Sequence, residues 1–277
     1  MANRGFVMLA QNSDNDYVHQ ACVNAMSIHA SNPDAKVSLV TNDPVPEKYR
    51  QFFDYILKIP FGDRAKEKVW KIQNRWKLYH ATPYDQTIIL DTDMLVLQDI
   101  SKSWARLSNY DMFFTSKVKT YRGEDMHDEY YRKTFIANNL PNVYSALHYF
   151  QKNHYSYEFY TWLEYIVENY EEFYKKHAPK KYQRHCSIDV SMAIAIKILG
   201  IENEVLNENE PLTFVHMKTN NQGWNEPVTS WLDKLNVYQK PNLELKLGNF
   251  KQDTILHYTE KDFATIVSKK YEDYHNV

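Results

Sequence analysis

Continuous apolar runs and helix-like repeats of apolar residues alternate along the first half of the chain. The runs at 6–10, 36–41 and 55–59 are each followed by polar residues or proline, and this pattern predicts three buried strands. Between the first two runs, apolar residues recur every three or four positions from 17 to about 30. That spacing predicts a helix that ends before Pro33.

A second helix and a strongly apolar strand follow. Four large apolar or aromatic residues at helical spacing predict a helix over 69–80, and the run at 87–90 predicts the fourth strand. Strands that alternate with helices through short connections are typical of βαβ units and a parallel sheet. We therefore expect an α/β fold, with a Rossmann-type mixed, mainly parallel sheet flanked by helices.

The second half of the chain is less regular. The elements predicted there are strands at 111–115, 212–215 and 254–256, helices at 158–176 and 189–199, and a mobile loop at 124–132. Gly200 is expected to end the second of these helices. Because no repeat of fixed period and no flexible linker interrupts the chain, we expect a single domain over 1–277.

Composition and charge exclude several classes of protein. Apolar residues make up 43% of the chain and charged residues 25%, which is ordinary for a globular protein and excludes disorder. The net charge of -2 argues against wholesale electrostatic binding to nucleic acid or to an anionic membrane. Cys22 and Cys186 are too few for a disulfide framework or a four-thiolate zinc site. Since no apolar run approaches the length of a membrane span, we expect a cytoplasmic protein without a membrane span or a nucleic-acid partner.

The candidate chemistry lies at the end of the fourth predicted strand. Asp91 and Asp93 are two positions apart, so on a strand both carboxylates project to the same side. Ligands of open α/β sheets bind at the carboxyl ends of the strands. Two like charges in one crevice repel each other unless a cation lies near them, and oxygen ligands suit Mg²⁺ or Mn²⁺. The alternative is that Asp91 caps a turn and Asp93 faces solvent.

The order of motifs resembles the GT-A glycosyltransferases, and most closely family 8, the glycogenin and lipopolysaccharide galactosyltransferase group. The matching features are Arg75 on a helix, then Thr82-Pro83-Tyr84-Asp85, then Ile88-Ile89-Leu90-Asp91-Thr92-Asp93. The strand, polar loop, helix and strand over 6–42 resemble the same family. The resemblance implies a metal-dependent enzyme that transfers a sugar from a nucleotide-sugar donor. Residues 1–115 would bind the nucleotide sugar, and 116–277 would form the acceptor side with a C-terminal metal-binding loop.

The resemblance also implies roles for individual residues. Asp91 and Asp93, with Thr92 between them, would bind Mn²⁺ (or Mg²⁺) and the donor diphosphate. The loop after the first strand would hold the base through Asn12 and Tyr17. Arg75 would approach the donor, for which a UDP-sugar is favoured. The transferred sugar would most simply be a hexose. The acceptor would be a glycan, a protein or a small molecule.

A late histidine and lysine complete the implied metal site. Family members carry a His and, a few residues later, a Lys after a late strand, and His257 and Lys261 occupy that place. A neutral imidazole is a sound third ligand for Mn²⁺ beside two carboxylates. The lysine would neutralise charge on the leaving diphosphate. His216, with Lys218 two residues on, competes for the same role.

The resemblance implies a catalytic carboxylate at Asp189. Family members carry an Asp, usually followed by Gln, before a helix near the donor sugar. Here Ser187-Ile188-Asp189-Val190 leads into the helix predicted over 189–199, so Val replaces the Gln. The alternative is that Ser187 or Asp189 only caps this helix.

Two other functions are compatible with parts of the pattern. Haloacid-dehalogenase-like phosphatases also use a strand followed by Asp-x-Asp, and would use Asp91 as nucleophile with Asp93. They require Thr or Val four residues after the first Asp, where this chain has Leu95, and their motif lies on the first strand. The second is a non-catalytic protein that binds nucleotide sugars or glycans on the same fold. No Gly-x-Gly-x-x-Gly or P-loop motif occurs, so a dehydrogenase or kinase has no support.

Overall fold

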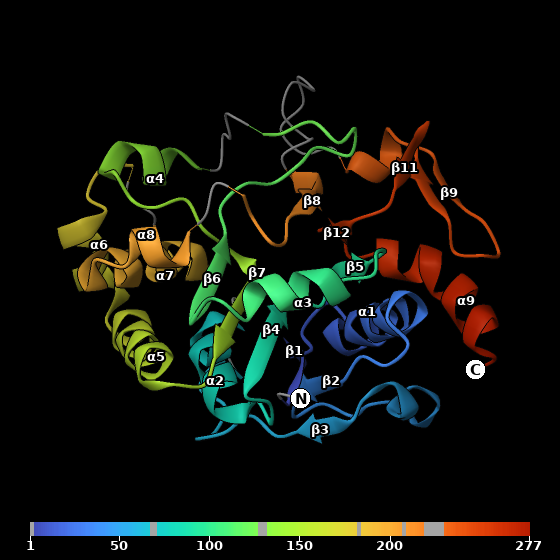
Figure 1. The fold of residues 1–277 in the computed structure, drawn as a ribbon, viewed down its shortest axis with the longest axis horizontal. Helices are drawn as coiled ribbons and strands as arrows, with labels where there is room; N and C mark the ends of the chain where they lie inside the picture. The colour runs from blue at the N-terminus through green and yellow to red at the C-terminus, as the bar shows by residue number, and fades with distance from the viewer. Residues whose placement is uncertain (1–2, 67–70, 127–131, 182–183, 207–208, 219–229) are drawn as a thin grey trace.

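The computed structural model describes residues 3–66, 71–126, 132–181, 184–206, 209–218 and 230–277 (Figure 1). Its centre is a six-stranded sheet in the order β3-β2-β1-β4-β7-β6. The strands are β1 (Arg4–Leu9), β2 (Val37–Val40), β3 (Tyr55–Leu57), β4 (Gln86–Leu90), β6 (Met112–Thr115) and β7 (Tyr144–Gln151). Strands β3, β2, β1 and β4 are parallel, and β7 runs antiparallel to both β4 and β6. The predicted α/β fold with a mixed, mainly parallel sheet is confirmed.

Two small sheets lie beyond the central one. One has the order β5-β12-β8, and the other is an antiparallel sheet in the order β11-β10-β9. Their strands are β5 (Met94–Val96), β8 (Phe214–His216), β9 (Val237–Gln239), β10 (Leu245–Leu247), β11 (Phe250–Gln252) and β12 (Ile255–His257). Because β12 pairs antiparallel with β5, the C-terminal part of the chain lies directly beside the turn that follows β4.

Helices cover both faces of the central sheet (Figure 1). The longer ones are α1 (Tyr17–Ser31), α3 (Ser101–Leu107), α5 (His154–Glu168), α6 (Tyr170–His177), α7 (Ile188–Leu199) and α9 (Phe263–His275). Shorter segments are η1 (Glu47–Phe52), η2 (Lys71–Lys77), α2 (Leu78–Ala81), α4 (Lys133–Asn138), α8 (Glu202–Val205) and η5 (Trp231–Asp233). In β1, Phe6 and Met8 join the core under α1, α3 and α9, whereas Val7 and Leu9 join the core under α5 and α7. Burial on both faces explains why the strand reads as a continuous apolar run.

Two predicted helices differ from the structure. The segment predicted as a helix over 69–80 is the 3₁₀ helix η2 followed by the short α2, and residues 67–70 lie outside the described part. A 3₁₀ helix superposes side chains three positions apart. This brings Lys77 Nζ within 2.6 Å of Asn74 Oδ1 in a buried pair.

The helix predicted over 158–176 is two helices, α5 and α6, which meet at Asn169. The Asn169 side chain donates to the carbonyl oxygen of Tyr165, a local bond that competes with continuation of the helix. Helix α5 begins earlier than predicted because Asn153 and Ser156 form a capping box.

The hydrophobic pattern did not predict β5, β7, α3, α9 or the β9–β11 sheet. Of the loop predicted over 124–132, residues 127–131 lie outside the described part.

The helix predicted over 189–199 is confirmed as α7, with Gly200 at its C-cap in the left-handed region. No helix in the described part of the chain combines the length and the apolar character that crossing a bilayer requires.

Gly5 gives a test of the packing between β1 and the turn at Pro83 before β4. A Cβ added there would lie 2.4 Å from Tyr84 Cε2 and 2.8 Å from the carbonyl oxygen of Lys36. We expect Gly5→Ala to lower the free energy of unfolding by about 3 kcal/mol, since the backbone oxygen cannot move aside. In the control Gly123→Ala, nothing lies within 4 Å of the new Cβ, and only the positive φ opposes it, at about 1 kcal/mol. Urea denaturation measures both; equal losses would contradict the clash.

Candidate active site

Asp91 and Asp93 belong to the turn between β4 and β5. Strand β4 ends at Leu90 and β5 begins at Met94, so the carboxylates do not project from a strand as the sequence pattern predicted. The backbone of the turn is fixed on both sides. The Asp91 N–H donates to the Ala146 carbonyl oxygen at 3.0 Å, and the Asp93 carbonyl oxygen accepts from the Tyr258 N–H at 3.1 Å.

The two carboxylates and His257 form a candidate metal site. One ligand atom from each of Asp91, Asp93 and His257 lies within 4.8 Å of the others. The register of β5 and β12 causes this, because His257 is paired with Met94, the residue after Asp93. His257 Nε2 lies 3.2 Å from Asp93 Oδ1, and both side chains are buried. Two carboxylates and one imidazole are a donor set that fits Mn²⁺.

The structure brings His257 to the carboxylates and places His216 behind it. In the parallel pairing of β8 with β12, His216 is the register partner of His257. The two rings are stacked with their centroids 4.7 Å apart. Burial, together with the neighbouring His257, lowers the pKa of His216 well below its ordinary value. His216 is therefore the neutral ring that packs against His257, and Lys218 follows it beyond the end of β8.

Cationic side chains contact both carboxylates. Lys261 Nζ donates to Asp93 Oδ2 at 2.7 Å, and the Arg75 guanidinium forms an ion pair with Asp91. Burial opposes the ionisation of Asp93, but His257 and Lys261 outweigh it and hold its pKa well below the usual range. Lys261 Nζ also lies 5.0 Å from the centre of the Tyr17 ring. The site thus contains two anions and two cations that are already paired.

A cavity of about 220 Å³ opens beside these groups. It is lined by Leu9, Gln11, Tyr17, Lys71, Ile72, Arg75, Asp91, Thr92, Asp93, Ile188 and Lys261. Six residues named from the sequence are therefore together at one cavity. Asn12 is not among them. Its Oδ1 accepts from the Val18 N–H at 2.9 Å and its Nδ2 donates to Asp16, so it holds the start of α1.

Gln11 lines the cavity and was missed in the sequence. Its Nε2 donates to the Asp63 carboxylate at 3.0 and 3.1 Å, and its Oε1 accepts from Asn74 Nδ2 at 3.1 Å. Asn74 in turn accepts from Lys77, whose pKa is lowered by burial. Its position in the sequence could have identified it as a candidate site residue, because Gln11 follows the apolar run of β1 as Asp91 follows that of β4.

Asp189 contacts β7 and a buried arginine, and does not cap its helix. Ser187 is the N-cap residue of α7 and makes no side-chain capping bond. Asp189 Oδ1 accepts from the Ser145 N–H at 2.9 Å, and Oδ2 lies 3.0 Å from Arg132. Burial raises the pKa of Asp189, but Arg132 and Ser145 outweigh it and lower the pKa overall. Neither Arg132 nor Ser145 was identified from the sequence.

A buried histidine supports Ser145. His148 Nδ1 lies 2.9 Å from the Ser145 carbonyl oxygen, and His148 Nε2 lies 2.9 Å from the Tyr160 hydroxyl. Burial and the nearby Arg75 lower the pKa of His148 to about 3, so the ring is neutral at physiological pH. This network fixes the β7 segment that Asp189 contacts.

The fold is that of the GT-A glycosyltransferases. Among solved structures, the galactosyltransferase LgtC, in complex with donor and acceptor sugar analogs, is 15% identical over 98% of this chain and 96% of that chain, with a TM-score of 0.54. Mouse xyloside xylosyltransferase 1 is 10% identical over 92% of this chain and 97% of that one, with a TM-score of 0.52.

The bifunctional glycosyltransferase WbbM is similar over 98% of this chain and 50% of its own, at 12% identity and a TM-score of 0.53. No protein-family model and no curated protein matches the sequence. The resemblance found in the motifs is thus confirmed for the fold.

The depressed pKa of Asp189 predicts a pH-dependent contribution to stability. A carboxylate with a folded pKa below its unfolded value, about 3.9, stabilises the fold above that pH and loses this effect as pH falls through the folded pKa. We expect Asp189→Asn to lower the free energy of unfolding by about 2 kcal/mol at pH 7, and the difference from wild type to shrink toward pH 3.

Urea denaturation at both pH values measures this difference. The control Asp273→Asn removes an exposed pair with Lys269, and we expect little change at either pH. A loss in Asp189→Asn that is the same at pH 3 and pH 7 would contradict the ionic contribution of Asp189.

Proposed function

We propose that the protein is a metal-dependent glycosyltransferase that transfers a sugar, most simply a hexose, from a nucleotide-sugar donor. The observation that carries the proposal is the convergence of Asp91, Asp93 and His257 within 4.8 Å, beside a cavity that the two carboxylates line together with Arg75 and Lys261. This arrangement fits a diphosphate together with a metal ion. The diphosphate can pair with the metal ion and with both basic side chains. A UDP-sugar is the favoured donor by resemblance to the family.

Asp91, Asp93 and His257 would hold the metal ion. An imidazole in the donor set favours Mn²⁺ over Mg²⁺, which prefers oxygen ligands and water. When bound, such an ion acts as a Lewis acid that neutralises charge on the departing diphosphate. Arg75 and Lys261 would add positive charge on the same side of the leaving group.

The proposal also assigns residues to the base and to the sugar of the donor. The Tyr17 ring lines the cavity and would contact the base, and Asn12 would act by holding the start of α1, where Tyr17 lies. Asp189 is the proposed catalytic carboxylate, and 27% of its side chain is exposed. In this proposal 1–115 bind the nucleotide, and 116–277 supply His257, Lys261 and Asp189 within one domain.

The alternatives lead to different products. A phosphatase that uses Asp91 as nucleophile would release inorganic phosphate, and the pairing of Asp91 with Arg75 leaves that carboxylate poorly placed to attack. A non-catalytic binding protein would bind donor without turnover. Incubation with UDP-, GDP-, CMP- and dTDP-linked sugars, with and without Mn²⁺, separates these functions. We expect Mn²⁺-dependent release of nucleoside diphosphate from one class of donor; phosphate release or no turnover would contradict the proposal.

Removal of either metal-binding carboxylate is the first test of the site. Wild type at a UDP concentration of about 100 Kd with saturating Mn²⁺ should gain about 2.7 kcal/mol of stability. We expect Asp91→Asn and Asp93→Asn to abolish this gain, because the neutral amide no longer attracts the cation. Thermal shift with and without Mn²⁺ measures it, and Asp273→Asn is the exposed control. Full stabilisation in both site variants would place the metal elsewhere.

The two histidines give a matched pair of variants. His257→Ala removes a ligand atom, so we expect Mn²⁺ affinity in the presence of UDP to fall by about tenfold or more. His216→Ala removes only the ring stacked behind, so we expect a smaller loss. Titration of free Mn²⁺ by electron paramagnetic resonance measures both affinities. The reverse ranking would assign the ligand to His216 and the proposed role of Lys261 to Lys218.

A further inference from the structure

Helix α1 carries a stripe of polar side chains on a buried face. Gln20, Asn24, Ser27 and Ser31 are four, three and four positions apart, which places them on one side of the helix. The first three are at most 2% exposed. Buried polar side chains in an apolar helix require hydrogen-bond partners. The partners of this stripe lie in the segment that follows β4.

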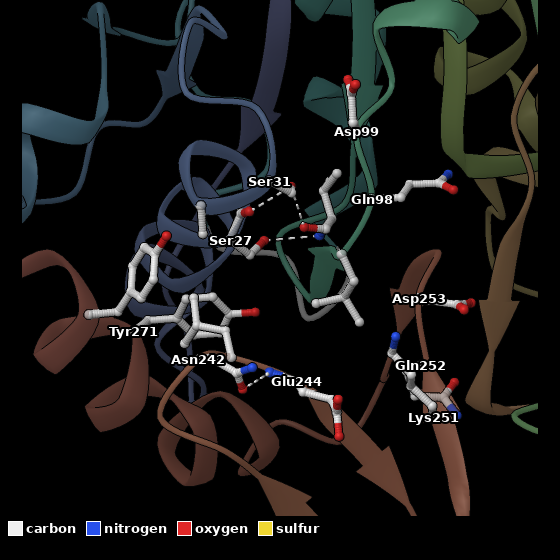
Figure 2. Close-up of a pocket in the computed structure, with 15 residues that line it drawn as sticks. Ser27, Ser31, Gln98, Asp99, Asn242, Glu244, Lys251, Gln252, Asp253 and Tyr271 are labelled. Carbon is white, nitrogen blue, oxygen red and sulfur yellow. Dashed lines mark hydrogen bonds between the residues drawn. The ribbon is translucent and has the colours of Figure 1, made fainter.

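The polar side chains of the stripe bond to the backbone of β5 in the way that a neighbouring strand would. Strand β5 is at the edge of its sheet, and among the described residues no strand pairs with the other side of its backbone. The Val96 N–H donates to Ser27 Oγ at 2.9 Å, and Ser31 Oγ donates to the Val96 carbonyl oxygen at 2.8 Å. Figure 2 shows Ser27 and Ser31 making these contacts, at the edge of a cavity of about 420 Å³. Helix α1 thus fixes the strand that continues from Asp93.

Asn24 is the member of the stripe that contacts the main chain of Asp91. Its Nδ2 donates to the Asp91 carbonyl oxygen at 3.0 Å. Since the Asp91 N–H donates to Ala146 of β7, the Asp91 peptide groups are held by α1 and by the central sheet together. Thr92 Oγ1, in the same turn, lies 3.4 Å from Gln20 Oε1.

Asn24 is an unfavourable choice for packing alone. It is fully buried, and its Oδ1 makes no hydrogen bond to any residue that the structure describes. A buried acceptor without a partner costs stability that an apolar side chain of similar size would avoid. Residues that break such a rule are expected where function requires them. The bond to Asp91 is the contact that an apolar residue would not provide.

We propose that Asn24 is a positioning residue for the metal site. Asn24 holds the Asp91 main chain through its hydrogen bond. In this way it keeps the carboxylates of Asp91 and Asp93 close to each other and to His257, with one ligand atom of each residue within 4.8 Å of the others. Groups that orient metal ligands in this way commonly change affinity by about 10–100-fold when removed. This inference rests on the proposed function, because it requires that the cluster binds a metal.

The test compares two variants of the same stripe. Asn24→Leu removes the bond to Asp91, and Ser27→Ala removes a bond of the same helix to Val96, three residues beyond Asp93. We expect Asn24→Leu to weaken Mn²⁺ binding in the presence of UDP by about tenfold or more, with little change in Ser27→Ala. Electron paramagnetic resonance of Mn²⁺ measures the affinity, and the melting temperature reports the general loss of packing. Asn24→Ala is the second variant if Asn24→Leu does not fold.

The outcomes separate positioning from a purely structural role. Mn²⁺ affinity of Asn24→Leu equal to that of wild type would overturn the inference, as would equal losses of affinity in Asn24→Leu and Ser27→Ala. A fall in melting temperature without a fall in affinity would also overturn it. If wild type itself binds no Mn²⁺ with UDP, the proposed function fails first. If wild type binds and Asn24→Leu binds equally well, only the positioning role fails.

Discussion

The antiparallel pairing of β5 with β12 is the contact on which the candidate site depends. It joins the segment directly after Asp93 to the segment that ends at His257, and the Asp93 carbonyl oxygen accepts from Tyr258 at the end of the same ladder. A slip of one residue would turn His257 to the opposite face of the sheet. Burial of both strands makes such a slip costly, because every residue of β5 and β12 is buried.

Local hydrophobic patterns predicted the strands whose two faces are both covered by apolar side chains. Strands β1, β2 and β4 are buried on both faces, so their sequences are continuous apolar runs, and polar residues mark where they end. The same contrast made Asp91 and Asp93 recognisable. His257 and Lys261 could be named only through the resemblance to a family, because one histidine among 11 carries no local signal.

The remaining features depend on contacts between distant segments. Arg132 and Ser145 meet Asp189 only when α4, β7 and α7 are packed together, and no periodicity records that meeting. Asn24 and Gln11 were missed for a different reason. Each is a polar residue within or next to an apolar segment, and a search for hydrophobic periodicity counts such residues only as interruptions of the segment. Short strands such as β9 to β11 are set by pairing with each other, so a three-residue sequence does not define them.

The late position of β12 has a consequence for the chain during its synthesis. The segments of β1 to β7, which contain the strands of the central sheet together with Asp91 and Asp93, are synthesised first. His257 and Lys261 are synthesised later, because β12 follows β8 and the strands β9 to β11 in the chain. A chain that ends before β12 would therefore carry Asp91 and Asp93 without His257 and Lys261, the two groups that contact the Asp93 carboxylate. In the proposed function, such a chain would lack one metal ligand and one of the two cations for the diphosphate, so donor binding would begin only after β12 has been made.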